Sequence, residues 1–169
     1  MIVCYEFMIE FRKLPPERWK DLRDIRLEAL QSDPLAFASS YEEEKLLKPK
    51  EWKKRVENTL FALSNDSPVG MIVYIFSDKI KTNHIANIYG VYVKKEYRSQ
   101  GIGKKLVDGV ISIIQQNTNV SKIQLTVTAE QTAAIALYKK NGFIEVGTLK
   151  RELQVKGKFY DELVMEKFL

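Results

Sequence analysis

The turn at residues 98–104 combines glycines and cations in a pattern suited to binding phosphate. It follows a strand-like run at 85–93 and precedes an amphipathic run at 106–114 that has helical spacing. Gly101 and Gly103 carry no Cβ, so a ligand can approach the backbone closely there. The first N–H groups of a helix have no intrahelical partner and carry partial positive charge. The turn therefore predicts a site for a phosphate-bearing ligand.

Two common phosphate-binding motifs do not fit this turn. A dinucleotide-binding fingerprint needs a third glycine three residues after the second, and this chain has Leu106 at that place. A P-loop needs Lys-Ser or Lys-Thr after its last glycine, whereas Lys104 and Lys105 follow here. Neither class of nucleotide site is predicted.

Three stretches resemble parts of the GNAT superfamily of N-acetyltransferases. The turn at 98–103, which reads Arg-x-x-Gly-x-Gly after the run 89–97, resembles the loop that binds the pyrophosphate of acetyl-CoA. The pattern Ala-Ile-x-Leu-Tyr-x-x-x-Gly-Phe at 134–143 resembles a second signature of the family. The stretch 157–165 resembles the end of many members. The resemblance covers nearly the whole chain, with specific motifs from residue 85 onward.

The resemblance implies a fold and an activity. The fold is α/β (α+β), the GNAT fold, with a mixed central sheet of about seven strands, helices on both faces, and a splayed cleft between the fourth and fifth strands. Residues 1–169 would form a single N-acetyltransferase domain. The activity is transfer of the acetyl group of acetyl-CoA to a primary amine, by direct attack in a ternary complex. A peptide N-terminus, an amino acid or a small amine could each be the acceptor, and a homodimer is left open.

The resemblance also assigns roles to individual residues. Tyr138 occupies the position of the general acid, and a phenol of pKa ~10 is still protonated at neutral pH and can donate to the departing sulfur. Simple packing under the helix is the alternative for this ring. Gln131 replaces the usual Asn before the second signature and can still hydrogen-bond coenzyme A. The full set implied for the cofactor is Val91, Tyr92 and Val93 through main-chain groups, Arg98, Ser99, Gln100, Gly101, Ile102, Gly103, Lys104 and Gln131.

The general base departs from the pattern seen in part of the family. Many members carry Glu on the central strand where this chain has Tyr89, and Asn87 lies two residues earlier. Neither accepts a proton near neutral pH, so we expect water held by these residues or by strand carbonyls to do so. An alkyl amine of pKa ~10.4 is only about 0.1% neutral at pH 7.4, whereas an α-amine at ~7.7–8.0 needs little help. The missing carboxylate thus favours an α-amine acceptor.

The run 41–44 offers two interpretations. Tyr41 and Glu42, with the two glutamates that follow, could receive a cationic amine, because the family builds a wall of its acceptor pocket from this region. Alternatively, these carboxylates form the solvated face of a helix and lie in its first turn, where negative charge is favourable. This is the commoner role for such a run. His84, the only histidine, is expected to be a hydrogen-bonded surface residue.

Composition limits the class of protein. The 169 residues are 45% hydrophobic and 29% charged, as in a soluble globular domain. No run reaches the ~18 apolar residues of a membrane span, and the first seven residues do not resemble a signal peptide, so we expect a cytoplasmic protein without a membrane partner. Cys4 is the only cysteine, which excludes an internal disulfide and a cysteine metal cluster, and no metal is predicted.

The net charge of +5 raises the question of nucleic acid. The lysines and arginines are scattered rather than gathered on one helix, so no nucleic-acid partner is predicted. A basic balance suits coenzyme A, which is a polyanion. A noncatalytic acyl-CoA-binding regulator is the alternative function, motivated by the missing glutamate.

Periodicity and turn residues predict the elements that position these side chains. Strands are expected at 7–12, 60–64, 69–76, 85–93, 122–128, 144–155 and 159–168. Helices are expected at 17–30, in a short piece before Pro49, at 51–57, from the phosphate turn to about 116, and at 130–140.

Overall fold

A computed structural model describes residues 8–169, which form a seven-stranded mixed sheet in the order β1-β2-β3-β4-β5-β7-β6. The expectations for Cys4 and Phe7 lie outside the described residues. The strands are β1 Ile9–Arg12, β2 Thr59–Ser64, β3 Ser67–Phe76, β4 Ile85–Val93, β5 Lys122–Thr128, β6 Ile144–Val155 and β7 Lys158–Phe168. All neighbours pair antiparallel except β4 and β5, which are parallel. The predicted mixed sheet is therefore confirmed.

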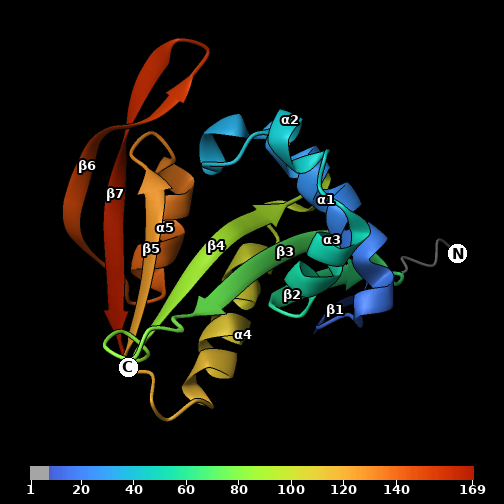
Figure 1. Cartoon of the computed structure of the whole chain (residues 1–169), viewed down its shortest axis with the longest axis horizontal. Helices are drawn as coiled ribbons and strands as arrows, with labels where there is room; N and C mark the ends of the chain where they lie inside the picture. Colours follow the sequence, from blue (N-terminus) through green and yellow to red (C-terminus); the bar gives the residue numbers. More distant parts are fainter. Residues whose placement is uncertain (1–7) are drawn as a thin grey trace, which may run out of the picture.

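Helices cover both faces of this sheet, as expected (Figure 1). On one face, α1 and α3 bury Leu22 and Trp52 against Phe61 of β2. On the other, α4 packs on alternate residues of the same strands, such as Ala62, and α5 packs beside α4. This alternation follows from the two-residue period of a strand. The helices are α1 Trp19–Ser32, α2 Tyr41–Glu44, α3 Pro49–Val56, α4 Ile102–Gln115 and α5 Thr132–Lys140, with short 3-10 turns η1 Pro16–Arg18, η2 Pro34–Ala36 and η3 Lys95–Tyr97.

The central strands β4 and β5 separate along their length. They pair only from Ile85 to Asn87 of β4, and beyond that point they diverge, with β4 in light green and β5 in orange in Figure 1. Gly90 has φ +58°, and the register between β3 and β4 shifts beside it, which marks a bulge in β4. The bulge bends β4 away from β5. The expected split between the fourth and fifth strands is present.

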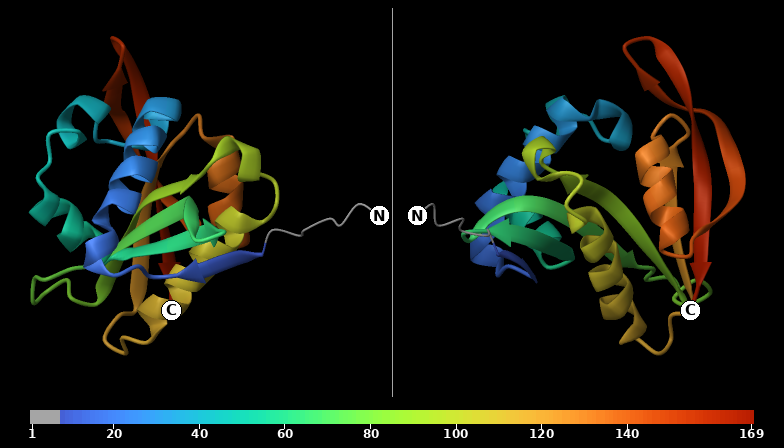
Figure 2. Two further views of the ribbon diagram at one scale, coloured as in Figure 1. Left: turned by 90° about the vertical axis from the view of Figure 1, so that its right-hand side faces the viewer. Right: turned by 180° about the vertical axis from the view of Figure 1, so that it is seen from behind.

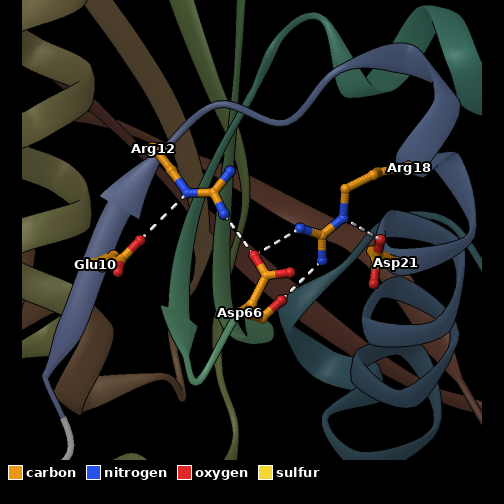
Figure 3. A network of polar contacts seen from close by, with 5 residues as sticks. All are labelled: Glu10, Arg12, Arg18, Asp21 and Asp66. Atoms are coloured by element: carbon orange, nitrogen blue, oxygen red, sulfur yellow. Dashed lines mark hydrogen bonds and ion pairs between the residues drawn. The ribbon is translucent and has the colours of Figure 1, made fainter.

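The β2–β3 hairpin is tighter than the sequence suggested. The predicted turn spanned 65–68, but only Asn65 and Asp66 form it, both with positive φ, and β3 already begins at Ser67. Two residues in the left-handed region are the geometry of a type I′ hairpin, which matches the twist of the strands. Asp66 then accepts hydrogen bonds from Arg12 and Arg18, which fastens the hairpin to β1 and η1 (Figure 3).

The C-terminal hairpin is long and largely exposed on β6. Lys156 and Gly157 form its turn with positive φ, and its tip projects past α5 in both views of Figure 2. Near the middle, Asp161 accepts from the main-chain N–H of Arg151, a residue with φ +56° that interrupts the pairing of β6. None of the helices within residues 8–169 is long and apolar enough to cross a membrane.

Candidate active site

A cleft of about 710 Å³ opens where β4 and β5 diverge. Its volume lies in the range of sites for small molecules and cofactors. β4, the turn after it, the start of α4, the end of β5, and α5 supply most of its walls. Twelve of the residues predicted from the sequence line it, namely Tyr89, Val91, Tyr92, Val93, Arg98, Ser99, Gly101, Ile102, Gly103, Lys104, Gln131 and Tyr138.

The phosphate turn presents unpartnered amides to this cleft. Gly101 is the N-cap of α4 with φ +76°, and no side chain caps the helix. No atom of residues 8–169 lies within 4 Å of the place where a Cβ of Gly101 would stand, so the backbone is open there. Ser99 also has a positive φ, +63°. Free N–H groups and the positive end of the helix dipole therefore face open space, which fits a pyrophosphate group.

The two cations of the turn already have protein partners. Arg98 donates from Nε to the Val93 carbonyl at 2.8 Å and from Nη2 to Asp33 at 2.6 Å. Lys104 forms an exposed ion pair with Asp108 at 2.7 Å. Val93, one of the three residues whose main-chain groups were expected to pair with the pantetheine arm, thus has its carbonyl hydrogen-bonded to Arg98. The amides of the turn, rather than these two side chains, are the groups free for phosphate.

Tyr138 comes from α5 and is 6% exposed. Its ring packs edge-on against Phe143, with centroids 5.9 Å apart. Burial raises the pKa of the Tyr138 phenol well above its usual value, so the hydroxyl keeps its proton at neutral pH. Within residues 8–169, burial is the only cause of this shift and no hydrogen bond contributes to it, although the residue lines the cleft. It can therefore donate to a ligand atom.

Four predicted site residues lie outside the lining of the cleft. Asn87 sits where β4 and β5 still pair, opposite Gln124. Gln100 donates to the Glu96 carbonyl at 3.3 Å. Tyr41 and Glu42 are in α2, where Glu42 forms an ion pair with Lys45. Gln100 still belongs to the turn, between Ser99 and Gly101, which line the cleft, whereas Tyr41, Glu42 and Asn87 are not among the lining residues.

Glu43 and Glu44, which follow Tyr41 in α2, are held by contacts with other groups of the protein. Glu43 closes a capping box with Ser40. Glu44 is 3% exposed and accepts two hydrogen bonds from Arg26, at 2.8 and 3.0 Å, while Arg55 pairs with it at 3.0 Å. A Cβ on Gly90 would stand 2.9 Å from Arg26, so this ion cluster lies directly behind the bulge of β4. The cluster supports the wall of the cleft.

Several residues that line the cleft were not predicted from the sequence. Asp33 follows α1, Thr126 and Thr128 come from β5, and Glu162 comes from β7. Thr128 donates from Oγ1 to the Leu35 carbonyl at 2.5 Å, which ties β5 to η2. The alternation of polar with apolar residues in β5 could have identified the threonines as facing away from the core. Nothing in the local sequence distinguishes Glu162 from an ordinary exposed strand residue.

Two further features of the site are the environment of the Tyr92 phenol and the arrangement of possible metal ligands. Burial raises the pKa of the Tyr92 phenol, which also donates to Glu28 at 3.0 Å. Across residues 8–169, no group of three or more His, Cys, Asp or Glu side chains is placed to hold a metal ion.

Comparisons with known proteins agree with this geometry. The profile of the acetyltransferase (GNAT) family matches residues 19–143. An L-amino acid N-acetyltransferase of Escherichia coli strain K12 is 26% identical over 119 residues, which cover 68% of this chain and 73% of that protein. The structure of a GNAT acetyltransferase from Streptococcus pneumoniae has 25% identity and a TM-score of 0.85, over 96% of this chain and 100% of the other. A ribosomal-protein-alanine N-acetyltransferase from Brucella melitensis has 27% identity and a TM-score of 0.81, over 95% and 99%. The chain therefore belongs to the GNAT family of acetyl-CoA-dependent N-acetyltransferases.

Proposed function

We propose that this protein transfers the acetyl group of acetyl-CoA to the α-amine of an amino acid or of a peptide N-terminus, by direct attack in a ternary complex. The observation that carries the proposal is the cleft between β4 and β5, which joins the uncapped N-terminus of α4 to the protonated hydroxyl of Tyr138. In this proposal residues 1–169 act as one N-acetyltransferase domain. The cytoplasmic location and the homodimer stay predictions.

The residues of the cleft have separate roles in the reaction. Amides of the turn at 99–104 bind the pyrophosphate, and main-chain groups of Val91 and Tyr92 align the pantetheine arm along β4. The Tyr138 hydroxyl donates to the sulfur as the carbon–sulfur bond breaks. Residues 8–169 hold no cysteine, so none of the described residues that line the cleft could form an acetyl-cysteine intermediate, which favours direct transfer.

The choice of an α-amine has two supports. An α-amine has a pKa of about 8, so a substantial fraction is neutral at physiological pH, unlike the side chain of lysine at about 10.4. Two of the similar proteins described above are named for L-amino acids and for ribosomal-protein alanine. A small amine such as a polyamine is the second acceptor class.

An acceptor screen tests the proposal. Purified protein is mixed with acetyl-CoA and with free L-amino acids, alanyl and seryl tripeptides, polyamines or aminoglycosides, and thiol release is measured. We expect release that depends on an added α-amine, and intersecting lines in initial-velocity plots. Parallel lines would contradict the ternary complex. Acetyl-CoA binding without turnover on any amine would instead support the noncatalytic regulator.

A further inference from the structure

Glu162 presents a carboxyl group to the cleft on the face of the sheet opposite α5. In β5, Leu125 and Val127 pack in the core that includes α4 and α5, so Thr126 and Thr128 face the other way. Glu162 is the direct partner of Thr128 in the register of β5 with β7. Because cross-strand partners share a face, Glu162 lies on the side of Thr128 and away from α5.

The carboxyl group of Glu162 lacks a cationic neighbour in the described part of the chain. Within residues 8–169, Glu162 forms no ion pair, whereas Glu166, on the same face of β7, is paired with Lys122 at 2.6 Å. Burial raises the pKa of Glu162, the Thr126 hydroxyl lowers it, and the charge of Glu152 raises it, with a net upward shift. A carboxylate with a raised pKa is a stronger base than an ordinary one.

The positions of Glu162 and Tyr138 divide the cleft into two sides. Both residues line the same cavity. Tyr138 projects from α5, whereas Glu162 of β7 lies on the opposite face of the sheet. A thioester held between β4 and β5 would therefore have a proton donor on one side and a carboxylate on the other. An ammonium group entering on the carboxylate side would meet a negative charge that has no cationic partner within residues 8–169.

We propose that Glu162 is the general base that accepts a proton from the acceptor amine. This inference rests on the proposed function. It replaces the expectation that water held by Asn87 or Tyr89 takes the proton, because the carboxylate comes from β7 and not from the central strand.

The proposed step balances in atoms and charge. The Glu162 carboxylate takes one proton from the ammonium group, and the neutral nitrogen then forms a bond with the carbonyl carbon of the thioester. The carbon–sulfur bond breaks, and the sulfur takes the proton of the Tyr138 hydroxyl. The nitrogen releases its second proton to water, from which Tyr138 regains a proton. The products are an amide and a thiol, and Glu162 releases its proton to water.

Glu162→Gln tests the proposal because it keeps the size of the side chain and removes the base. Its probe is whichever L-amino acid or alanyl tripeptide the unmodified protein acetylates fastest, assayed from pH 6 to 10. We expect kcat/KM to fall about 100-fold or more at pH 7, in line with general-base catalysis. The deficit should shrink toward pH 10, because the solution then supplies neutral amine. The Kd for acetyl-CoA, measured by calorimetry, should stay within about twofold.

Glu152→Gln is the matched control. Glu152 is exposed and outside the lining of the cleft, yet its charge raises the pKa of Glu162. We expect near-normal turnover at pH 8. Because removal of the Glu152 charge lowers the pKa of Glu162, the fall of kcat/KM on the acid side of the pH profile should move to lower pH. An unmoved acid limb would contradict the assignment of that limb to Glu162.

Several outcomes overturn the inference. The base role is refuted if the dependence of kcat/KM on pH in Glu162→Gln matches that of the unmodified protein. It is also refuted if the loss of kcat/KM is constant with pH and comes only from a higher KM. Titration of the glutamate carboxyl carbons by NMR gives a readout without turnover, with the Glu162 signal identified by its absence in the variant. A midpoint at or below that of ordinary glutamate also refutes the proposal. If the unmodified protein acetylates none of the amines, the proposed function itself fails, and the comparison of variants is not needed to show it.

Discussion

Arg98 donates a 2.6 Å hydrogen bond to Asp33 and so connects the phosphate turn to the residue that ends α1. Its Nε donates to the carbonyl of Val93, which fixes the same side chain against the end of β4. The guanidinium also lies 5.6 Å from the centroid of the Tyr92 ring. Arg98 therefore holds the turn in place, in addition to adding positive charge beside it.

Asp33→Asn tests this holding role. The side chains of Arg98 and Asp33 are 41% and 24% exposed, so their ion pair is expected to contribute about 0.5–1 kcal/mol. If the pair orders the turn, the variant should bind acetyl-CoA about two- to fivefold more weakly by calorimetry. Asp24→Asn, which changes an exposed pair with Arg23 on the same helix, is the control and should leave the Kd unchanged. Tighter binding in Asp33→Asn would instead show that Asp33 competes with phosphate for Arg98.

Gly103→Val tests the phosphate turn itself. A Cβ at Gly103 would stand 3.4 Å from the Leu137 side chain, an ordinary contact, so the variant should fold. Its branched carbons would occupy the cleft near the amides. Acetyl-CoA at 100 times its Kd should stabilise the unmodified protein by about 2.7 kcal/mol. Thermal melts of Gly103→Val should lose most of that shift.

Gly147→Val provides the comparison for this variant. Gly147 is in β6, outside the lining of the cleft, and no atom of residues 8–169 lies within 4 Å of its Cβ position. The ligand-induced shift in melting temperature should survive there. A folded Gly103→Val protein with unchanged affinity for acetyl-CoA would refute the assignment of the turn.

The fold was largely predictable because its signals are local. Period-two alternation gave the strands, and Gly142, with φ +84°, ends α5 as the Asn-Gly pair indicated. The differences are at element ends. Helix α1 begins at Trp19 after the 3-10 turn η1, and it extends to Ser32 before Pro34 interrupts the chain. Ends depend on caps and prolines, which periodicity does not resolve.

The site was predictable only where its residues lie close together in the sequence. The turn at 98–104 is one continuous segment, so its pattern is visible in the chain. Glu162 reaches the cleft through the pairing of β7 with β5, and Asp33 reaches it through its ion pair with Arg98. Both relationships join residues more than 30 positions apart. Glu44 illustrates the converse, because its run suggested either substrate binding or a solvated helix face, while the fold buries it against Arg26.

Tyr138→Phe separates acid catalysis from packing. The change keeps the ring that contacts Phe143 and removes only the hydroxyl. If the hydroxyl donates to sulfur, turnover should fall by roughly 10²–10⁴ while acetyl-CoA binding and melting temperature change little. If it served structure, stability would drop by about 1 kcal/mol and turnover would survive. Both quantities should be measured on one preparation, and near-normal turnover would eliminate the acid role.

Glu44→Gln tests the ion cluster behind the bulge of β4. Burial alone raises the pKa of Glu44, but the hydrogen bonds and charge of Arg26 and the charge of Arg55 outweigh it and hold the pKa below its ordinary value. Removing one partner of a buried ion pair leaves the other uncompensated, so unfolding by urea should require about 3 kcal/mol less free energy. Glu42→Gln, at an exposed pair with Lys45, is the control and should change stability by under about 0.5 kcal/mol.

The pH dependence of this loss gives a second check. A carboxyl group whose pKa is lower in the folded protein stabilises it fully above the pKa of the unfolded chain, and that stabilisation is lost as pH falls through the folded value. The difference in stability between the unmodified protein and Glu44→Gln should therefore be constant near neutral pH and diminish as the acid range is entered. A difference that stays constant to pH 3 would show that the loss comes from packing of the amide and not from the missing charge.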